Sequence, residues 1–135
     1  MSELQIDIIS PSKKVFSGTI RSLTVPGTKG SFQILKNHAP IISTFEIGLI
    51  KMHNGTSEHY FASGGGTVEV MNNKILLLAD SIEEVKDIDI ERAKEAKKRA
   101  EERLSTRENK EIDVERARLA LARALNRIRI YNKYR

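Results

Sequence analysis

The stretch Ile88-Asp89-Ile90-Glu91-Arg92-Ala93-Lys94-Glu95-Ala96 returns further along the chain as Ile112-Asp113-Val114-Glu115-Arg116-Ala117-Arg118-Leu119-Ala120. Six of the nine aligned positions are identical. In each copy an aspartate, Asp89 or Asp113, stands where its carboxylate can accept a hydrogen bond from the backbone of a first helical turn. The isoleucine before it can pack against the fourth helical residue, which is alanine in both copies. The repeat therefore predicts two similarly capped helices folded into a hairpin.

The two helices are expected to span roughly residues 89–104 and 113–131. Apolar residues recur along each at spacings of three and four, which is typical of a helix-packing seam. The expected seams are Ile90, Ala93, Ala96, Ala100 and Leu104 in the first helix and Val114, Ala117, Leu121, Ala124, Ile128 and Tyr131 in the second. Alanine at the seam centres allows close approach but buries little apolar area, so the hairpin is expected to be marginally stable by itself.

The chain ahead of the repeat predicts short β-strands. Leu4, Ile6 and Ile8 alternate with polar residues, which indicates a half-buried strand. Further strands are expected at residues 14–16, 19–26 after a break at Gly18, 31–35, 40–44, 46–52, 57–62, 66–71 and 74–79. Asn54-Gly55 and Asn72-Asn73 are hairpin-turn signals, since Asn and Gly tolerate positive φ. The predicted fold is α+β: an N-terminal antiparallel β-sandwich domain at residues 1–84, followed by a C-terminal antiparallel two-helix hairpin at residues 85–135.

Composition excludes several classes of function. The chain has no cysteine, which excludes disulfides and thiolate metal sites. No apolar run approaches the roughly 18–20 residues that span a bilayer, so we expect no direct membrane insertion. Residues 1–4 show neither the basic nor the apolar region of a signal peptide.

The net charge of +5 lies entirely in the predicted hairpin. Residues 1–86 carry 8 Lys/Arg and 8 Asp/Glu, whereas residues 87–135 carry 15 Lys/Arg and 10 Asp/Glu. A basic appendage indicates an acidic partner, which can be a protein surface, a nucleotide phosphate or a nucleic acid. The alternative is a solvated helix pair with i,i+4 ion pairs such as Glu95–Arg99.

Four arginines are candidate anion ligands. Arg92 and Arg99 share a face of the first predicted helix, and Arg123 and Arg127 share a face of the second. If the helices fold antiparallel, the two guanidinium pairs can converge on a phosphate, whose oxygens match the planar donors two at a time. Glu83 and Asp89, at the entrance to the hairpin, are candidate partners for Arg92 or for the base of a nucleotide. Surface salt bridging is the alternative.

No catalytic constellation is found. The glycine-rich stretches at residues 26–31 and 64–66 lead into predicted strands, whereas a phosphate-binding loop leads into a helix. His38, His53 and His59 lack metal-ligand spacing, and no Ser or Thr has a convincing His/Asp partner. We therefore expect neither a metal site nor an active site.

Several motifs are similar to the epsilon subunit of F-type ATP synthases. Residues 27–35 leading to His38-Ala39-Pro40 resemble its signature, as do Ser63-Gly64-Gly65 before Val68-Glu69-Val70, residues 8–11 with 15–18, and the helix opening at residues 87–93. The resemblance covers nearly the whole chain in the right order. Two departures are Lys36-Asn37, where the family usually has Pro-Gly, and Gly66, where an aromatic residue is common.

This resemblance implies a non-catalytic subunit of the central stalk, in the bacterial enzyme that couples proton flow to ATP synthesis. The family's epsilon subunit turns with the gamma subunit, contacts the ring of c subunits and uses its hairpin to inhibit ATP hydrolysis by the alpha/beta catalytic head. The implied location is peripheral, at the cytoplasmic face of the bacterial plasma membrane.

The hairpin further resembles those of bacterial epsilon subunits that bind ATP through Ile/Leu-Asp-x-x-Arg-Ala, which here is residues 88–93. The residues implied in ATP binding are Glu83, Ile88, Asp89, Arg92, Ala93, Arg99, Arg123 and Arg127. ATP would be a regulatory ligand, with no cofactor required. The alternative from another class is a basic, hairpin-based nucleic-acid-binding module, which the lack of stacking aromatics and the interspersed acids disfavour.

Overall fold

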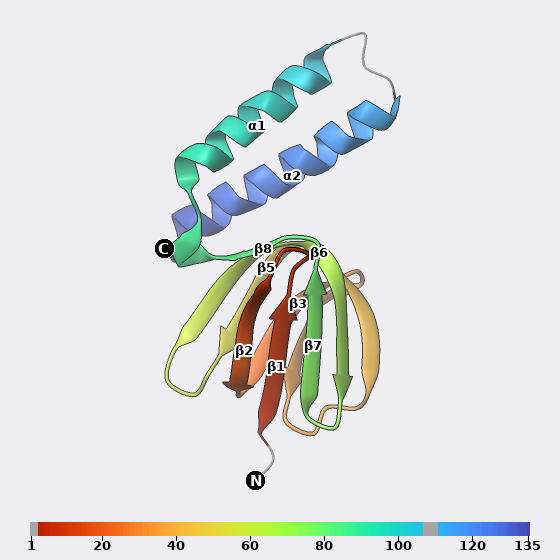
Figure 1. Ribbon diagram of the computed structural model, residues 1–135, viewed down its shortest axis with the longest axis vertical. Helices are drawn as coiled ribbons and strands as arrows, with labels where there is room; N and C mark the ends of the chain where they lie inside the picture. The colour runs from red at the N-terminus through yellow and green to blue at the C-terminus, as the bar shows by residue number, and fades with distance from the viewer. Residues whose placement is uncertain (1–2, 107–110) are drawn as a thin grey trace. The chain divides into compact units, whose positions relative to one another are not determined.

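The computed structural model describes residues 3–106 and 111–135, and the chain divides by its internal contacts into Met1–Glu84 and Val85–Arg135. The first unit is a two-layered β-sandwich and the second contains two α-helices (Figure 1). The strands are β1 Leu4–Ile9, β2 Lys14–Ile20, β3 Ser22–Gly27, β4 Gly30–Leu35, β5 Ile41–His53, β6 Glu58–Met71, β7 Lys74–Ala79 and β8 Ile82–Glu84. The helices are the 3-10 helix η1 Val85–Asp87, α1 Ile90–Ser105 and α2 Glu111–Tyr134.

Period-two alternation builds the core of the sandwich. Leu4, Ile6 and Ile8 on β1 are at most 2% exposed, while the residues between them face outward. Other strands contribute inward side chains in the same way, among them Leu23, Val25, Ile34, Ile50, Phe61, Val68 and Leu77. The predicted alternation is therefore confirmed. It also determines which side chains of each strand face the solvent.

The strand order is β2-β1-β7-β6-β5-β3-β4, with β8 paired to β6. β1 pairs with β7 in parallel, with Ile6 opposite Ile75, and the other pairs are antiparallel. The predicted fold class is confirmed, but the sandwich is not wholly antiparallel. Turn signals reveal only neighbours joined by short hairpins, and a parallel pair is joined through a long crossover.

Two long strands correct the sequence prediction. β5 and β6 pair in one register from Ile41↔Val70 to His53↔Glu58, although the ends of strands were expected near Phe45 and at residues 63–65. β6 pairs with β7 through residues 66–71 and with β8 through residues 61–63, so one strand serves both layers (Figure 1). β8, which has three residues, was missed, and Gly18 lies within β2 instead of ending it.

Both family departures have a structural reason. Asn37 adopts a φ of 66°, the left-handed conformation that a glycine there would adopt, and asparagine tolerates it. Its backbone N–H donates to Oδ1 of Asn73 at 2.6 Å, which ties this loop to the β6–β7 turn. Gly66 has a φ of 159°, and a Cβ at that position would lie 2.0 Å from the carbonyl oxygen of Leu78. No side chain fits there in this backbone.

The helical unit confirms the hairpin. α1 and α2 lie side by side and run antiparallel, and α2 also contacts η1 (Figure 1). Ala93 and Ala100 of α1 and Ala117 and Ala124 of α2 are buried, as the seams predicted. None of the described helices combines the length and the apolar character that a membrane crossing requires.

The two copies of the repeat differ at their caps. Oδ1 of Asp89 accepts the backbone N–H of Arg92 at 3.1 Å, so Asp89 is an N-cap as predicted. Asp113 is not, because α2 already includes Glu111 and Asp113 therefore lies inside the helix. The helical pattern continues upstream of the second copy, and a capping residue type does not end a helix by itself.

Candidate functional site

The start of α1 brings three of the expected ATP-binding residues together. Ile88 is 7% exposed, and its N–H donates to the carbonyl of Val85 at 3.3 Å. Ala93, 3% exposed, donates its N–H to the carbonyl of Asp89 at 3.0 Å. The Asp89 carboxylate is held at the helix N-terminus by its capping bond and keeps its second oxygen as an acceptor. This end of α1 therefore presents a fixed carboxylate beside small apolar surface.

The expected arginines share one side of the hairpin. Arg92, Arg99 and Arg123 each directly precede a buried seam alanine, and residues on an α-helix are about 100° apart. In an antiparallel pair of right-handed helices, the positions that precede the facing residues lie on the same side of the pair. Arg127, three residues after Ala124, falls on that side too. The geometry brings both helices' arginines to one side, as the sequence predicted.

Three of these guanidinium groups have no partner in the described part of the chain. Arg92 and Arg99 are exposed and form no hydrogen bond or ion pair there. The Nε atom of Arg123 is buried and has no hydrogen-bond partner among the described residues. Glu95–Arg99, the ion pair proposed as the alternative explanation, does not form, whereas Lys94 lies 3.9 Å from Glu91. The guanidinium groups of Arg92, Arg99 and Arg123 are therefore not engaged by the described residues.

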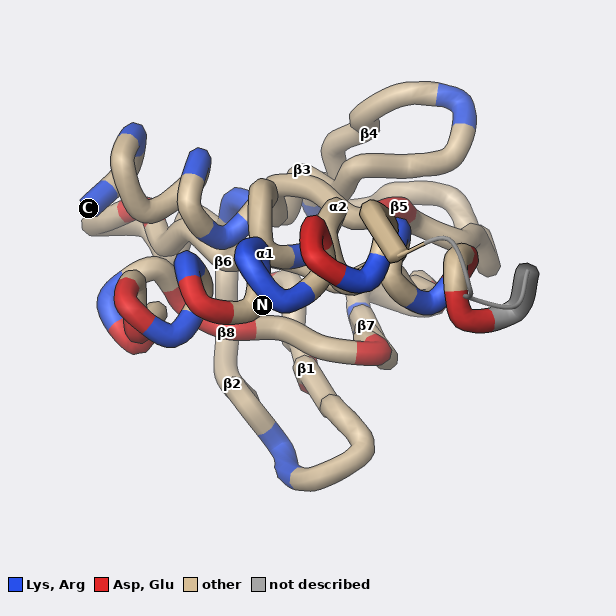
Figure 2. The backbone as a smooth tube through the Cα atoms, turned by 90° about the horizontal axis from the view of Figure 1, so that it is seen from above, with Lys and Arg blue, Asp and Glu red and all other residues tan. Residues whose placement is uncertain are grey.

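Asn126 is a buried polar residue that sequence reasoning missed. It is 6% exposed, and its Oδ1 accepts Nη2 of Arg129 at 2.8 Å. The i,i+3 spacing of an amide and a guanidinium was the available signal. Lys and Arg recur along both helices with acids between them (Figure 2), so the bond holds one of several cations of α2 in place.

Glu83 belongs to a different unit of the chain from the other expected site residues. It is half-buried on β8 in the sandwich unit, where it pairs with Ala62 of β6. Its neighbour Glu84 places Oε2 2.9 Å from Nδ1 of His59, which ties the end of β8 to β6. Seven of the eight expected ATP-binding residues belong to the helical unit and one to the sandwich unit.

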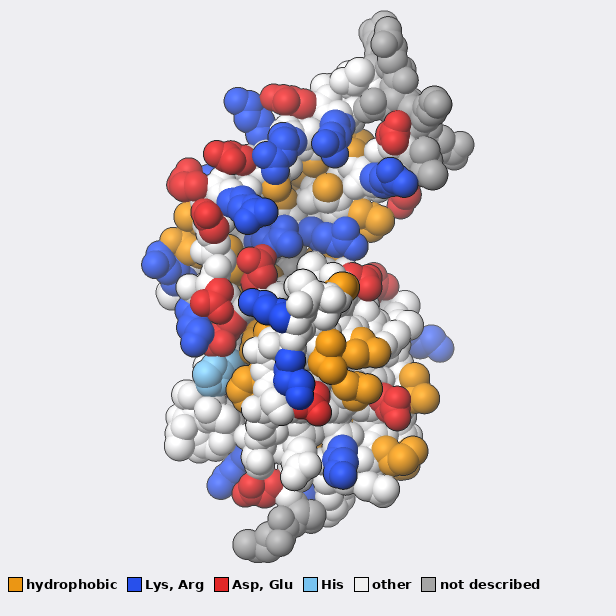
Figure 3. All heavy atoms as spheres, in the orientation of Figure 1, with side chains coloured by type: hydrophobic (Ala, Val, Ile, Leu, Met, Phe, Trp, Pro, Cys, Tyr) orange, Lys and Arg blue, Asp and Glu red, His pale blue; other side chains and the backbone are white. Residues whose placement is uncertain are grey.

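The outer face of the sandwich carries exposed apolar side chains. Ile42 on β5 is 77% exposed and Leu78 on β7 is 43% exposed. In the register of the strands, Leu78 lies between Thr67 of β6 and Ile9 of β1. Leu76 lies beside Glu69, which in turn lies beside Ile42. Leu76 and Leu78 are two residues apart on β7, so all of these side chains are on one face. Hydrophobic side chains gather on this face in the space-filling view (Figure 3). An exposed group of apolar side chains is a candidate docking surface.

The histidines take part in local structure. Nδ1 of His38 lies 2.7 Å from the carbonyl oxygen of Ala39, and Nδ1 of His53 accepts the N–H of Gly55. Among residues 3–106 and 111–135, no group of three or more His, Asp or Glu side chains is placed to hold a metal ion.

Comparison with known families matches both units. Residues 3–85 match the family model described as ATP synthase, Delta/Epsilon chain, beta-sandwich domain, and residues 86–132 match ATP synthase, Delta/Epsilon chain, long alpha-helix domain. The chain belongs to the ATP synthase delta/epsilon family. The resemblance noted from its motifs is thereby confirmed, and membership in this family favours the stalk-subunit hypothesis over a nucleic-acid-binding module.

Curated members of the delta/epsilon family are similar over most of their length. The chain is 43% identical over 103 residues to the ATP synthase epsilon chain of Desulforamulus reducens, covering 76% of this chain and 78% of the relative. It is 44% identical over 103 residues to the ATP synthase epsilon chain of Nitratidesulfovibrio vulgaris (strain DP4), covering 76% of each.

Solved structures share the fold. A chain of the Euglena gracilis mitochondrial ATP synthase matches with a TM-score of 0.74 at 14% identity, over 90% of this chain and 77% of that one. A chain of the Tetrahymena thermophila mitochondrial ATP synthase central stalk and c-ring matches with a TM-score of 0.63 at 10% identity, over 96% of each. At these identities the likeness concerns the fold alone.

Proposed function

We propose that this chain acts as the epsilon subunit of a bacterial F-type, proton-transporting ATP synthase, in the central stalk and without an active site of its own. It would lie peripherally, as part of the complex, at the cytoplasmic face of the plasma membrane. The observation that carries the proposal is the match of both family models, in order, to the two units of the chain.

The sandwich is the docking unit in this proposal. Its exposed apolar face supports contact with the gamma subunit, because burying Ile42 and Leu78 removes apolar surface from water. The polar end of the sandwich, where Asn37 and Asn73 join two loops, is left for contact with the c ring.

Copurification tests this docking. The chain, expressed with the gamma subunit and the alpha/beta head of its own enzyme, should purify as one complex. Ile42→Asp should weaken its retention, since it places a charge on the apolar face, whereas Gln33→Asp, an exposed position on β4, should not. Retention of both variants at wild-type level would contradict the assigned face.

The hairpin is the regulatory unit in this proposal. Its excess of basic residues supports engagement of acidic surface on the alpha/beta head, which would inhibit ATP hydrolysis. Charge reversal at Arg116, Arg118 and Arg123 should weaken the inhibition and reduce its sensitivity to salt. Reversal of the exposed lysines Lys13, Lys29 and Lys36 in the sandwich unit is the matched control. Full inhibition by the hairpin variant would contradict the electrostatic account.

ATP is the proposed switch. Ile88, Asp89 and Ala93 would contact the adenine end of the nucleotide, the arginine side of the hairpin would contact its phosphates, and Glu83 would lie near the entrance. Such a ligand touches both helices, so it would stabilise the hairpin in its paired form relative to a separated one. ATP at high concentration would thereby keep the hairpin from inhibiting the enzyme.

A further inference from the structure

A groove of about 310 Å³ opens in the sandwich unit where β7 extends beyond β1. Ile9, the last residue of β1, lies opposite Leu78, after which the chain turns away at Ser10 and Pro11. β7 ends at Ala79, and the chain continues to Asp80 without β1 beside it. The groove therefore lies between the β1–β2 connection and the free end of β7, and it adjoins the apolar face.

The walls of this groove are largely apolar. Ile9, Pro11 and Leu78 line it, and Leu78 is 43% exposed. Gly66 lines it as well, and the close approach of the Leu78 carbonyl leaves no space for a side chain there.

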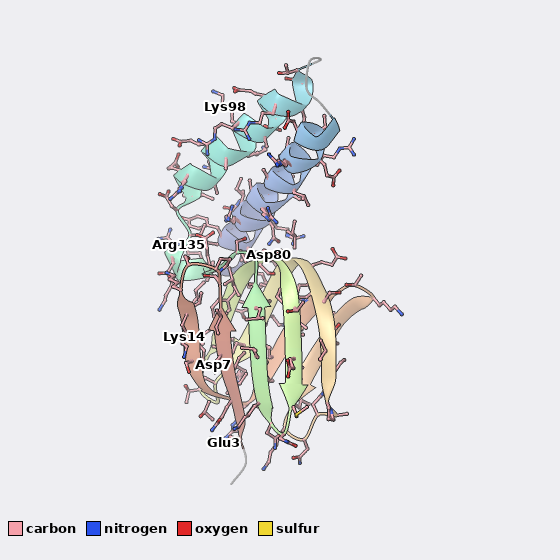
Figure 4. The ribbon with its side chains drawn as sticks, turned by 45° about the vertical axis from the view of Figure 1, so that its right-hand side comes forward. Glu3, Asp7, Lys14, Asp80, Lys98 and Arg135 are labelled. Atoms are coloured by element: carbon pink, nitrogen blue, oxygen red, sulfur yellow. The ribbon has the colours of Figure 1, made fainter. Side chains whose placement is uncertain are left out.

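Asp80 lies at one end of the groove, and Figure 4 labels it next to the end of β7. Its N–H donates to the carbonyl of Gly65 at 2.8 Å, and Gly64 donates to the carbonyl of Ser81 at 2.8 Å, so the backbone on both sides is held. Among the residues that the structure describes, its carboxylate has no hydrogen-bond or ion-pair partner. A carboxylate without a partner is therefore presented from a held backbone at one end of the groove.

We propose that this groove receives a lysine or arginine side chain of the protein that docks on the sandwich. Such a side chain has an apolar stem, which would lie along Ile9, Pro11 and Leu78, and a cationic head, which would pair with Asp80. The carboxylate repels nucleic acid and anionic lipid, so a basic protein residue is the complementary occupant. The inference rests on the proposed docking of the sandwich to the gamma subunit and adds the residue that fixes its position.

Binding of the full chain to the immobilised gamma subunit, at several salt concentrations, tests the proposal. Asp80→Asn keeps the shape of the side chain and removes its charge, so it should weaken binding by about tenfold or more and make it less salt-dependent. Glu3→Gln, which removes an exposed carboxylate at the far end of β1, should change binding less than about twofold. Matching ¹H–¹⁵N spectra would show that each variant is folded.

A charge exchange identifies the occupant. Asp80→Lys should abolish binding, and one Lys→Glu or Arg→Glu substitution in gamma should weaken binding of the wild-type chain and restore binding of Asp80→Lys. Wild-type affinity in both Asp80 variants would overturn the groove assignment while leaving docking intact. Weakening without any rescuing partner would overturn it also, since the partner's apolar or backbone groups would then fill the groove.

A gamma-independent probe separates the two proposals. N-acetyl-lysine methylamide should shift the amide signals of Leu78, Ala79 and Asp80 in the isolated chain, and Asp80→Asn should remove these shifts. Failure of the wild-type chain to bind gamma would count against the docking proposal. Absence of the probe's shifts would count against the groove.

Discussion

The sandwich and the hairpin bury different kinds of side chain. In the sandwich, Phe61, Ile8 and Leu77 are at most 1% exposed, and each large apolar side chain contributes about 1.5–3 kcal/mol when fully buried. The two helices bury Ala93, Ala100, Ala117 and Ala124, each with a single methyl group, and among the described residues Ile130 is the one large apolar side chain that they bury. The sandwich therefore buries much more apolar side chain per residue than the hairpin, and the proposed switching of the hairpin by a ligand or a partner relies on this difference.

The largest effect is expected in the sandwich core. Phe61→Ala should lower the free energy of unfolding by about 3–5 kcal/mol, because it leaves a cavity where a fully buried ring stood. Urea unfolding followed by circular dichroism in the β-sheet region measures it. A loss below about 1 kcal/mol would show that the core is looser than its burial indicates.

ATP binding should show the next largest effect, in the hairpin. Arg99→Ala should weaken binding by roughly 1.5–3 kcal/mol, since it removes a charge-assisted contact to phosphate. Isothermal titration of the full chain measures this change, and Lys98→Ala, an exposed neighbour on α1 outside the proposed site, is the control. Equal binding in both variants, or no heat at millimolar ATP, would show that these arginines do not bind ATP.

The two copies of the repeat allow a direct comparison of two aspartates, with a smaller expected effect on stability. Asp89→Ala should destabilise the start of α1 by about 1 kcal/mol, because it removes the cap on the Arg92 N–H. Asp113→Ala should have a smaller effect, because Asp113 lies within α2. Amide hydrogen exchange in the first turns of the two helices reports both, and equal effects would show that the two aspartates have the same role.

The smallest effect is expected from removal of the hairpin. A chain ending at Glu84 should keep its sheet signal and nearly the same urea midpoint, since the core side chains of the sandwich come from its own strands. Circular dichroism of the shortened chain decides the matter. An unfolded product would mean that the sandwich needs the helical unit.

Local patterns predicted much of this fold. The alternation of Leu4, Ile6 and Ile8 fixed the inward face of β1, and the seam alanines fixed the pairing of the helices. Non-local features escaped prediction. The parallel pairing of β1 with β7 leaves no turn signal, and the glycines at 64–66, which as a group indicate a turn, lie inside β6.

The sequence predicted which arginines belong to the candidate site, but it did not predict the groove of the sandwich. The spacing of Arg92 and Arg99 placed both on one side of α1, and the antiparallel pairing added Arg123. Asp80 gave no signal, because a single aspartate after a strand resembles any turn residue. The groove beside Asp80 arises because β1 ends at Ile9 while the chain of β7 continues past Leu78.

The parallel pairing of β1 with β7 also sets the order in which the chain can fold. Gln5 pairs with Lys74, 69 positions later, so β1 cannot pair with β7 until nearly the whole sandwich unit has been synthesised. Contacts of such long range slow folding, whereas each helix of the hairpin forms from neighbours in sequence. During synthesis, β1 therefore keeps an exposed edge until β7 can pair with it. The helical unit follows β7 in the sequence, so it is synthesised after the strand that covers this edge.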